Sequence, residues 1–472
     1  MARSRSAWGV LAAAALAVCA SHLIATPEPT GCLRPELVRR DPGSTITCPL
    51  VRDYAHSRTL FLAAARRAGA ELHVLFPVTE DATLTTDVAI LRGGADGGLL
   101  LHLSGTHGVE GFVGSAIQRA LLDGVGRWRG ENGSTSPTVV FVHALNPFGM
   151  AHWRRADDDN VDLNRNCLLT SAQWANAKIP DRPSAGLYNA LASPVINPAK
   201  PPSAGANGFF RLVYRAARSM LAARAGPASL KSALVSGTYL RANGVFYGGV
   251  ALRPAHAGLH ALLRAELGLS GGRVWRRAVI VDVHTGLGVR GADTLMVSHA
   301  SAMGSVSASE PTVDSAAAAA AAALRDLGDG AFATEFIQAT HAHGAAAGYA
   351  HLLGGTDTCL AELLRAGDGG CSELCVALAQ EFGTVPQLAV LRALADENAA
   401  YWYPPGLPST ILSAGQRALS QSRWYFAGAM LDAFAPAGGA YAEEVIARGV
   451  GLFERAVLLL ARQDVPSPPG AK

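Results

Sequence analysis

The sequence lacks several patterns that mark common classes of protein. It contains no Cys-x-x-Cys pair, which argues against a zinc finger. Lys and Arg form no cluster interleaved with aromatic residues, and the net charge is only +3, so we expect no nucleic-acid partner. No Gly-x-Ser-x-Gly motif stands at the end of a predicted strand, which argues against a serine hydrolase. We also find no internal repeat and, after the N-terminal segment, no further apolar run that would span a bilayer.

The composition is that of a chain large enough for an extensive core. Of 472 residues, 49% are apolar and 16% are charged, which excludes a chain that is disordered throughout. Apolar runs of strand length predict these strands: Leu72–Val78, Asp87–Gly93, Gly98–Gly105, Thr138–Leu145, Ala278–Gly286 and Cys375–Gly383. Helices are expected at about 110–122, 209–225, 315–326, 385–399, 412–433 and 440–461. This alternation predicts an α/β fold, a single domain with a mixed, largely parallel central sheet flanked by helices.

The N-terminal segment has the pattern of a signal peptide. Basic residues in Met1–Arg5 precede an uncharged apolar stretch, Ala7–Ala20, that ends in small residues suited to signal peptidase. We therefore expect residues 1–25 to direct the chain into the secretory pathway, and the mature protein to be secreted or lumenal. The alternative is a signal anchor retained over residues 7–25, in which case the protein would be attached to a membrane.

The remainder of the chain divides into an arm and one large domain. Residues 26–49 are Pro-rich and polar, which predicts a linker. The globular pattern extends over residues 50–465, and the Pro-, Ala- and Ser-rich stretch near 170–235 is typical of an insertion or lid with short helices. A single glycosylation sequon begins at Asn132, in a polar stretch that reads as a surface loop.

The cysteines predict disulfides if the chain is exported. Removal of the signal peptide leaves six, and an even number behind such a segment fits three disulfides in an oxidising compartment. Proximity in the sequence alone suggests these pairs: Cys32 with Cys48, and Cys359 with Cys371 or Cys375. The alternative is that some of the six are buried thiols.

Three of the predicted strands end in polar side chains beside glycine. The stretches are "GTHGVE" with His107 and Glu110, "VDVHTG" with His284, and "QEFGT" with Glu381. Ligands of open α/β sheets bind outside the carboxyl ends of the strands, so we expect the four side chains to converge. Two imidazoles and one carboxylate make a catalytic zinc set, and a further carboxylate, here Glu381, then serves as general base. The alternatives are a helix cap, a core histidine and a surface ion pair.

A second polar segment, "NPFGMAHWRRADDDNVDLNRN", lies between two of these strands. Asn164 and Arg165 suit an anionic group of a substrate, because Arg binds a carboxylate through two parallel hydrogen bonds and Asn adds an amide beside it. Asp162 is placed to accept a hydrogen bond from a zinc-bound imidazole and to fix its tautomer. Arg154 and Arg155 either belong to the site or neutralise the neighbouring aspartates on a solvated loop.

Taken in order, these motifs resemble the zinc carboxypeptidase (M14-like) superfamily, and most closely its little-characterised DUF2817 branch. The resemblance covers about residues 50–460, and its most specific part is the run of motifs from 102 to 166. "DVHTG" and "EFGTVP" are also similar to the aspartoacylase and succinylglutamate desuccinylase branch, which uses the same zinc apparatus on N-acyl amino acids. The resemblance implies one Zn²⁺ per chain on His107, Glu110 and His284, with Glu381 as general base.

Roles for the second polar segment also follow from the resemblance. Asn164 and Arg165 would hold the terminal carboxylate of the substrate. Arg155 or Arg154 would polarise the scissile carbonyl, since the alignment does not decide between them. Asp162 would support a zinc-bound histidine.

The activity that the resemblance implies is hydrolysis of an amide bond next to a free carboxylate, by a metallocarboxypeptidase-type peptidase. Digestive carboxypeptidases place a mobile Tyr over the substrate terminus, and Tyr349 is only a candidate for that substrate-binding role. The residue that would set side-chain specificity is not identifiable. One alternative is an N-acyl amino acid deacylase with the same residues, so the partner is a peptide or an N-acyl amino acid. An alternative of another class is a catalytically inactive binding protein.

Overall fold

The computed structural model describes residues 50–461, except for positions 79, 95–96, 130–135, 181–182, 198–205, 299–332, 338–351, 366–370, 372–373 and 404–424. Several predictions fall outside the described residues: the signal segment, the arm at 26–49, the Cys32–Cys48 pair, the sequon at Asn132, the helix at 315–326 and the role of Tyr349.

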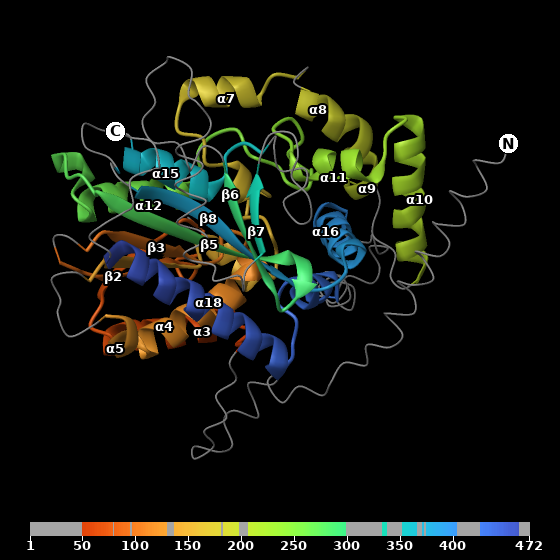
Figure 1. Cartoon of the computed structure of the whole chain (residues 1–472). Helices are drawn as coiled ribbons and strands as arrows, with labels where there is room; N and C mark the ends of the chain where they lie inside the picture. Colours follow the sequence, from red (N-terminus) through yellow and green to blue (C-terminus); the bar gives the residue numbers. More distant parts are fainter. Residues whose placement is uncertain are drawn as a thin grey trace.

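Eight strands form one mixed sheet at the centre of the structure (Figure 1). They are β1 (Glu71–Leu75), β2 (Thr86–Leu91), β3 (Leu99–Leu103), β4 (Thr138–His143), β5 (Arg277–Arg290), β6 (Asp293–Ser298), β7 (Ala333–Ile337) and β8 (Leu374–Gly383). Their order in the sheet is β1-β2-β4-β3-β5-β8-β6-β7. The adjacent strands β4, β3, β5 and β8 run parallel, whereas β1–β2, β2–β4 and β6–β8 are antiparallel. The predicted mixed, largely parallel sheet is confirmed.

Continuous apolar sequence accounts for the central strands. Every residue of β2, β3 and β4 is buried, as expected for strands covered on both faces. All six predicted strands are present, and β5 runs four residues further than its prediction, to Arg290. Strands β6 and β7 were not predicted.

Two layers of helices cover the sheet, and alternate strand residues face one layer or the other. One face packs against α3 (Tyr54–Arg67), α4 (Gly111–Asp123) and α18 (Gly439–Ala461), and the other against α12 (Pro254–Glu266) and α15 (Thr356–Arg365). In β3, for example, Leu100 belongs to the first core, whereas Leu99 and Leu101 belong to the second. Figure 1 shows these two layers on opposite sides of the sheet.

The long connection between β4 and β5 carries most of the other helices. They are α6 (Pro147–Ala151), α7 (Ser171–Ala177), α8 (Pro183–Leu187), the π-helical turn Tyr188–Ala192, α9 (Ser193–Ile196), α10 (Ala206–Ala222) and α11 (Pro227–Val235). A short α5 (Val125–Trp128) follows α4, and α16 (Gln387–Trp402) follows β8. Among the described residues, no helix combines the length and apolar character needed to cross a bilayer.

Candidate active site

Two imidazoles and one carboxylate converge at the carboxyl ends of β3 and β5. The Nδ1 atom of His107 lies 2.9 Å from Oε1 of Glu110. The Nδ1 atom of His284 lies 3.1 Å from Oε2 of the same carboxylate and 3.1 Å from Nδ1 of His107. All three side chains are buried. The structure therefore brings together the three predicted metal ligands from positions 177 residues apart in the chain.

Glycine allows the first two ligands to come from one tight turn. His107 has extended backbone and precedes the 3₁₀ turn Gly108–Glu110, so that the two side chains, three positions apart, face the same side. A Cβ atom on Gly108 would lie 2.1 Å from the backbone of Gly149, which leaves no space for any other residue. Gly105 adopts φ +70°, a conformation that side-chain-bearing residues rarely take. The glycines beside the ligands are thus a packing requirement.

Each imidazole is backed by a second carboxylate on its outer nitrogen. Nε2 of His107 lies 3.1 Å from Asp162, and Nε2 of His284 lies 3.1 Å from Asp282. With the ring hydrogens on these outer nitrogens, both Nδ1 atoms present lone pairs to the same point, beside the carboxylate of Glu110. A metal ion placed between these two lone pairs and the carboxylate would be bound by all three groups. The donor set suits zinc, which binds imidazole nitrogen and carboxylate oxygen.

Asp282 was not among the predicted site residues, although a signal for it was present. Residues two apart in a strand face the same side of a sheet, so Asp282 and His284 of "VDVH" share a face of β5. Thr106 holds Asp282 in turn, because its hydroxyl donates to the carboxylate at 2.8 Å. Second carboxylates of this kind fix the tautomer of a metal-binding imidazole.

The two neighbouring arginines separate in the structure. Arg155 lines a cavity together with His107 and His284, and it donates hydrogen bonds to Asp162 at 2.9 Å and to Glu110 at 3.2 Å. Burial opposes the negative charge of Asp162, but the neighbouring charge of Arg155 outweighs burial and holds the pKa of that carboxyl well below its usual value. The sequence left open which arginine faces the site, and the geometry places Arg155 there.

Arg154 points away from the cavity. Its guanidinium donates to Glu397 of α16 at 2.6 Å and to Asn160 at 2.8 Å, and it stacks on the ring of Tyr401 with 3.5 Å to the ring centre. Only 1% of the residue is exposed. Arg154 is therefore a buried structural arginine and does not neutralise a solvated loop.

Asn164 and Arg165 line the cavity beside Arg155. The backbone N–H of Thr356 donates to Oδ1 of Asn164 at 2.9 Å, which orients the side-chain amide. The guanidinium of Arg165 donates to the backbone carbonyl of Val235, at 2.7 Å from Nη2, and to that of Asn164, at 2.8 Å from Nη1. Backbone carbonyls thus hold this buried arginine in place at the cavity wall.

Glu381 reaches the same cavity from β8. The parallel register pairs it with His284 on the neighbouring strand β5. Its Oε1 accepts a hydrogen bond from the backbone of Leu287 at 2.9 Å. Burial, reinforced by the negative charge of Glu110, raises the pKa of Glu381 to about 6. A carboxyl with such a pKa changes protonation close to neutral pH, as a general base must.

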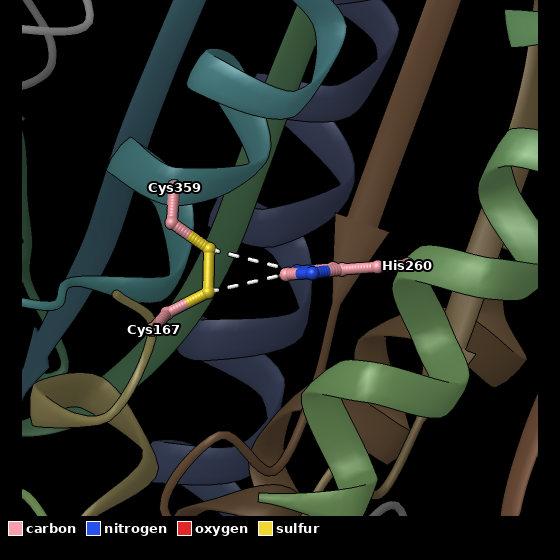
Figure 2. A group of neighbouring side chains, drawn as sticks. All are labelled: Cys167, His260 and Cys359. Carbon is pink, nitrogen blue, oxygen red and sulfur yellow. Dashed lines mark hydrogen bonds between the residues drawn. A yellow bond between two sulfur atoms is a disulfide. The ribbon is translucent and has the colours of Figure 1, made fainter. Parts of the chain in front are cut away.

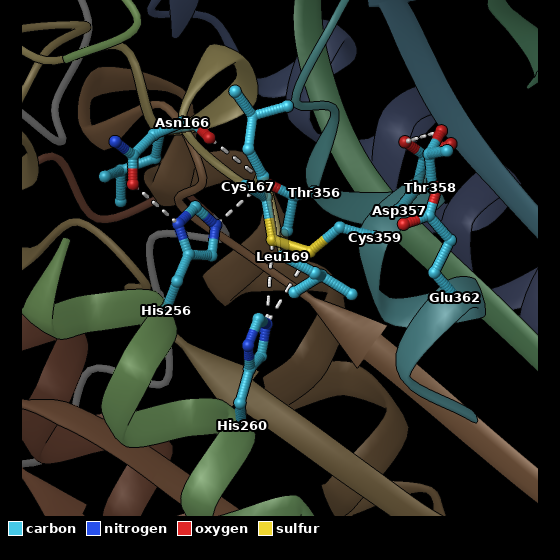
Figure 3. Close-up of a disulfide and its surroundings, with 12 residues drawn as sticks. Asn166, Cys167, Leu169, His256, His260, Thr356, Asp357, Thr358, Cys359 and Glu362 are labelled. Atoms are coloured by element: carbon cyan, nitrogen blue, oxygen red, sulfur yellow. Dashed lines mark hydrogen bonds between the residues drawn. A yellow bond between two sulfur atoms is a disulfide. The ribbon is translucent and has the colours of Figure 1, made fainter. Parts of the chain in front are cut away.

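A disulfide joins the Asn164–Arg165 turn to helix α15 (Figures 2 and 3). It links Cys167 with Cys359, so the predicted pairing of Cys359 with Cys371 or Cys375 is wrong. Cys371 instead donates a hydrogen bond to the carbonyl of Leu374. The error arises because neighbours in the fold, here 192 residues apart, need not be neighbours in the sequence.

His260 of α12 lies against this disulfide, with Nε2 3.6 Å from both sulfur atoms (Figure 2). Burial lowers the pKa of His260 to about 4, so its imidazole is neutral. Figure 3 shows His256, one turn earlier on α12, between Asn166 and Thr356. Together these contacts attach the Asn164–Arg165 turn to the sheet-covering helices.

A cavity of about 610 Å³ opens from the triad. Its polar part holds His107, His284, Glu381, Arg155 and the Asn164–Arg165 pair. Three polar residues of α15 that were not predicted also line it: Asp357, Thr358 and Glu362. Burial raises the pKa of Asp357 to about 6. No spacing or motif in the sequence distinguishes α15, so these residues were not detectable before the fold was known.

The fold and the triad define an α/β protein with a buried group of side chains that could hold a metal ion at the carboxyl edge of its sheet. The chain belongs to the family described as "Protein of unknown function (DUF2817)", whose model matches residues 50–448. The family prediction is therefore confirmed. A comparison with curated protein sequences gives no match.

Solved structures with a similar arrangement include metallocarboxypeptidases and related proteins. Bovine thrombin-activatable fibrinolysis inhibitor, in complex with tick carboxypeptidase inhibitor, is 11% identical at a TM-score of 0.39, over 80% of this chain and 95% of that one. A putative metallopeptidase of Shewanella baltica is 13% identical at a TM-score of 0.32, and the match covers 75% of this chain and 91% of that one. A putative succinylglutamate desuccinylase/aspartoacylase of Shewanella frigidimarina is 13% identical at a TM-score of 0.30, and the match covers 70% of this chain and 68% of that one. Because these TM-scores all lie below 0.5, the activity has to be inferred from the residues of this chain.

Proposed function

We propose that the protein is a zinc-dependent hydrolase that cleaves an amide bond next to a free carboxylate. The observation that carries the proposal is the meeting of two imidazole Nδ1 atoms and the Glu110 carboxylate, with His107 and His284 each backed by a separate carboxylate. This arrangement suits one Zn²⁺ per chain, held by His107, Glu110 and His284. A bound zinc would polarise the amide carbonyl and make a water molecule more acidic.

The chain's own residues supply the proton transfers and the anion contacts. Glu381 takes the proton of the attacking water and later delivers it to the leaving nitrogen. Arg155 donates hydrogen bonds to the oxyanion that develops on the carbonyl oxygen. Its contacts with Asp162 and Glu110 fix the guanidinium beforehand, so little reorganisation is needed during the reaction.

Asn164 and Arg165 hold the free carboxylate of the substrate. Thr356 orients the amide of Asn164, and the carbonyl of Val235 orients the guanidinium of Arg165. These donors lie in the same cavity as Glu381. A carboxylate on these donors positions the adjacent amide bond, which makes the attack effectively intramolecular.

Two substrate classes share this chemistry. A metallocarboxypeptidase-type peptidase is the candidate that the sequence motifs suggest. An N-acyl amino acid deacylase is the second candidate, and one observation favours it: much of the cavity wall is apolar, with few groups to bond a peptide backbone. A catalytically inactive binding protein is the remaining alternative.

Metal content and turnover test the proposal together. Elemental mass spectrometry of the purified wild type should give about one zinc per chain, and His107→Ala should lose it. Glu381→Gln should keep the zinc but lower kcat by about 10²–10⁴-fold, because only the proton acceptor is removed. A folded wild type without zinc would contradict the proposal and favour the binding protein. Full activity in Glu381→Gln would overturn the assignment of the base.

A further inference from the structure

The cavity extends well beyond the residues that the reaction needs. Helix α10 contributes Val213, Ala216, Ala217 and Met220 to its wall. These four positions follow the spacing i, i+3, i+4 and i+7, so one continuous apolar face of α10 looks into the cavity.

Two further helices complete this apolar wall. Helix α11 contributes Leu230 and Leu234, and its last residue, Val235, accepts the hydrogen bonds of Arg165. Helix α16 contributes Leu388, Leu391 and Leu394. We call the part of the cavity between α10, α11 and α16 the apolar chamber. Lys231 of α11 and Gln387 of α16 are the polar side chains that these three helices contribute to its described lining.

We propose that the apolar chamber binds a long alkyl chain, so that the substrate is an amino acid carrying a long N-acyl group. This inference rests on the proposed hydrolase function and names the substrate class for the same site. The chamber is continuous with the polar part of the cavity, where Glu381 and Arg165 lie. A molecule with a carboxylate, an amide and an alkyl chain therefore meets matching surfaces along its length.

An alkyl chain fits the chamber better than a peptide does. A peptide segment would bring backbone N–H and C=O groups into a wall that offers few partners, and each unbonded group is costly to bury. A volume of about 610 Å³ is also in the range that encloses a drug-sized ligand, on the order of 300–1,000 Å³, more than one amino acid side chain occupies. An acyl chain brings apolar surface and no unsatisfied polar group.

Chain length provides the first test. N-acetyl, N-hexanoyl, N-decanoyl and N-tetradecanoyl derivatives of the same amino acid would be hydrolysed by the zinc-loaded protein, beside blocked dipeptides with Phe or Leu at the C-terminus. We expect kcat/KM to rise by about fourfold for each added CH₂ until the chamber is full. No dependence on chain length would overturn the proposal, as would faster cleavage of the blocked dipeptides than of the decanoyl substrate.

A matched pair of variants on one helix provides the second test. Ala217→Phe places a ring inside the chamber, whereas Ala222→Phe places the same ring on the exposed side of α10. We expect Ala217→Phe to lower the ratio of decanoyl to acetyl kcat/KM at least tenfold and Ala222→Phe to leave both values unchanged. Equal effects of the two variants would contradict an occupied chamber.

Binding separates failure of this inference from failure of the proposed function. Dansylamino-undecanoic acid, a fluorescent fatty acid, should bind the wild type and Ala222→Phe, and should bind Ala217→Phe at least tenfold more weakly. If the protein hydrolyses none of the amides yet binds the probe with this dependence on the variants, the proposed hydrolase function is wrong, whereas the binding of an alkyl chain in the apolar chamber is supported. Hydrolysis of short-chain substrates without any probe binding would overturn the chamber alone.

Discussion

The cavity has two walls of opposite character. One wall is formed by the ends of β3, β5 and β8 and the Asn164–Arg165 turn, and each of its charged side chains has a partner within about 3 Å. The other is the apolar chamber, whose side chains offer surface and almost no hydrogen bonds. Under the proposed function, the polar wall determines which bond is cleaved, because hydrogen bonds fix the positions of its side chains. The apolar chamber then determines how large a group the substrate can carry beside that bond.

The two walls also differ in how they are built. Parallel strands place successive polar residues in register, as the pairing of His284 with Glu381 shows. The apolar chamber depends on packing between two consecutive helices of the β4–β5 connection, α10 and α11, and one distant helix, α16. A single substitution is therefore expected to change the chemistry at the polar wall and only the selectivity at the apolar wall.

The largest effects are expected for the two neighbouring arginines, of which Arg155 belongs to the polar wall and Arg154 to the core behind it. Arg154→Met should lower the free energy of unfolding by about 3–5 kcal/mol, because it leaves the buried Glu397 without its partner. Arg155→Met should lower kcat by about 10²–10³-fold through loss of an oxyanion donor. Denaturant unfolding of both variants would measure the free energy of unfolding, and steady-state kinetics would measure kcat. The assignment would be reversed if Arg154→Met lost the larger part of kcat.

A smaller effect is expected at Asp282, which contacts the proposed zinc ligand His284. Asp282→Asn should weaken zinc binding by about 10–100-fold, because the amide no longer fixes the tautomer of His284. Competition with a chelator gives the affinity. Asp293→Asn is the control, since Asp293 is equally buried but bonds Gln380 and Arg448. Similar losses in both variants would indicate a general structural effect.

The smallest effect concerns histidines outside both walls. Burial lowers the pKa of His102 and His143 to about 4 and that of His256 to about 3, below the usual 6.5. As the pH falls below 6.5, the unfolded chain takes up protons that the folded chain does not, so the free energy of unfolding should decrease down to about pH 4.

A variant isolates one of these histidines. His143→Gln keeps a polar partner for Ser115, which lies 3.0 Å from Nε2 of His143, but does not titrate. The loss of stability between pH 7 and pH 5 should shrink by about 2 kcal/mol relative to the wild type. Urea unfolding at the two pH values measures this difference. An unchanged pH dependence would show that the pKa of His143 is the same in the folded and unfolded chain, which would contradict the effect of burial.

The polar wall was largely predictable, because its proposed chemistry needs particular residue types that can be recognised in the sequence. Strands that end in His107, His284 and Glu381 could be identified by their apolar runs, and the sheet type follows from the alternation of strands and helices. Asp282 could have been found from the two-residue period of β5. The choice between Arg154 and Arg155 could not be made, since neighbours in a loop point in directions that only the fold determines.

The remaining features depend on contacts between distant segments. The partner of Cys359 is 192 residues away, and nothing in the local sequence indicates Cys167. Strand β6 begins with a buried aspartate, Asp293, whose charge is balanced by Arg448 of α18, a pattern unlike an apolar strand. Helices α10 and α16 were expected near their observed positions, yet the meeting of their apolar faces at one cavity has no signature in either segment.

The disulfide between Cys167 and Cys359 has a topological consequence. It closes the chain into a covalent loop that contains α10 and α11, two of the three helices of the apolar chamber, together with His284. A protease cut anywhere between the two cysteines would leave both fragments linked, so they would migrate as one band on a non-reducing gel and as two after reduction. The helices of the apolar chamber can thus stay covalently attached to the rest of the protein even after the peptide backbone between the two cysteines has been cut.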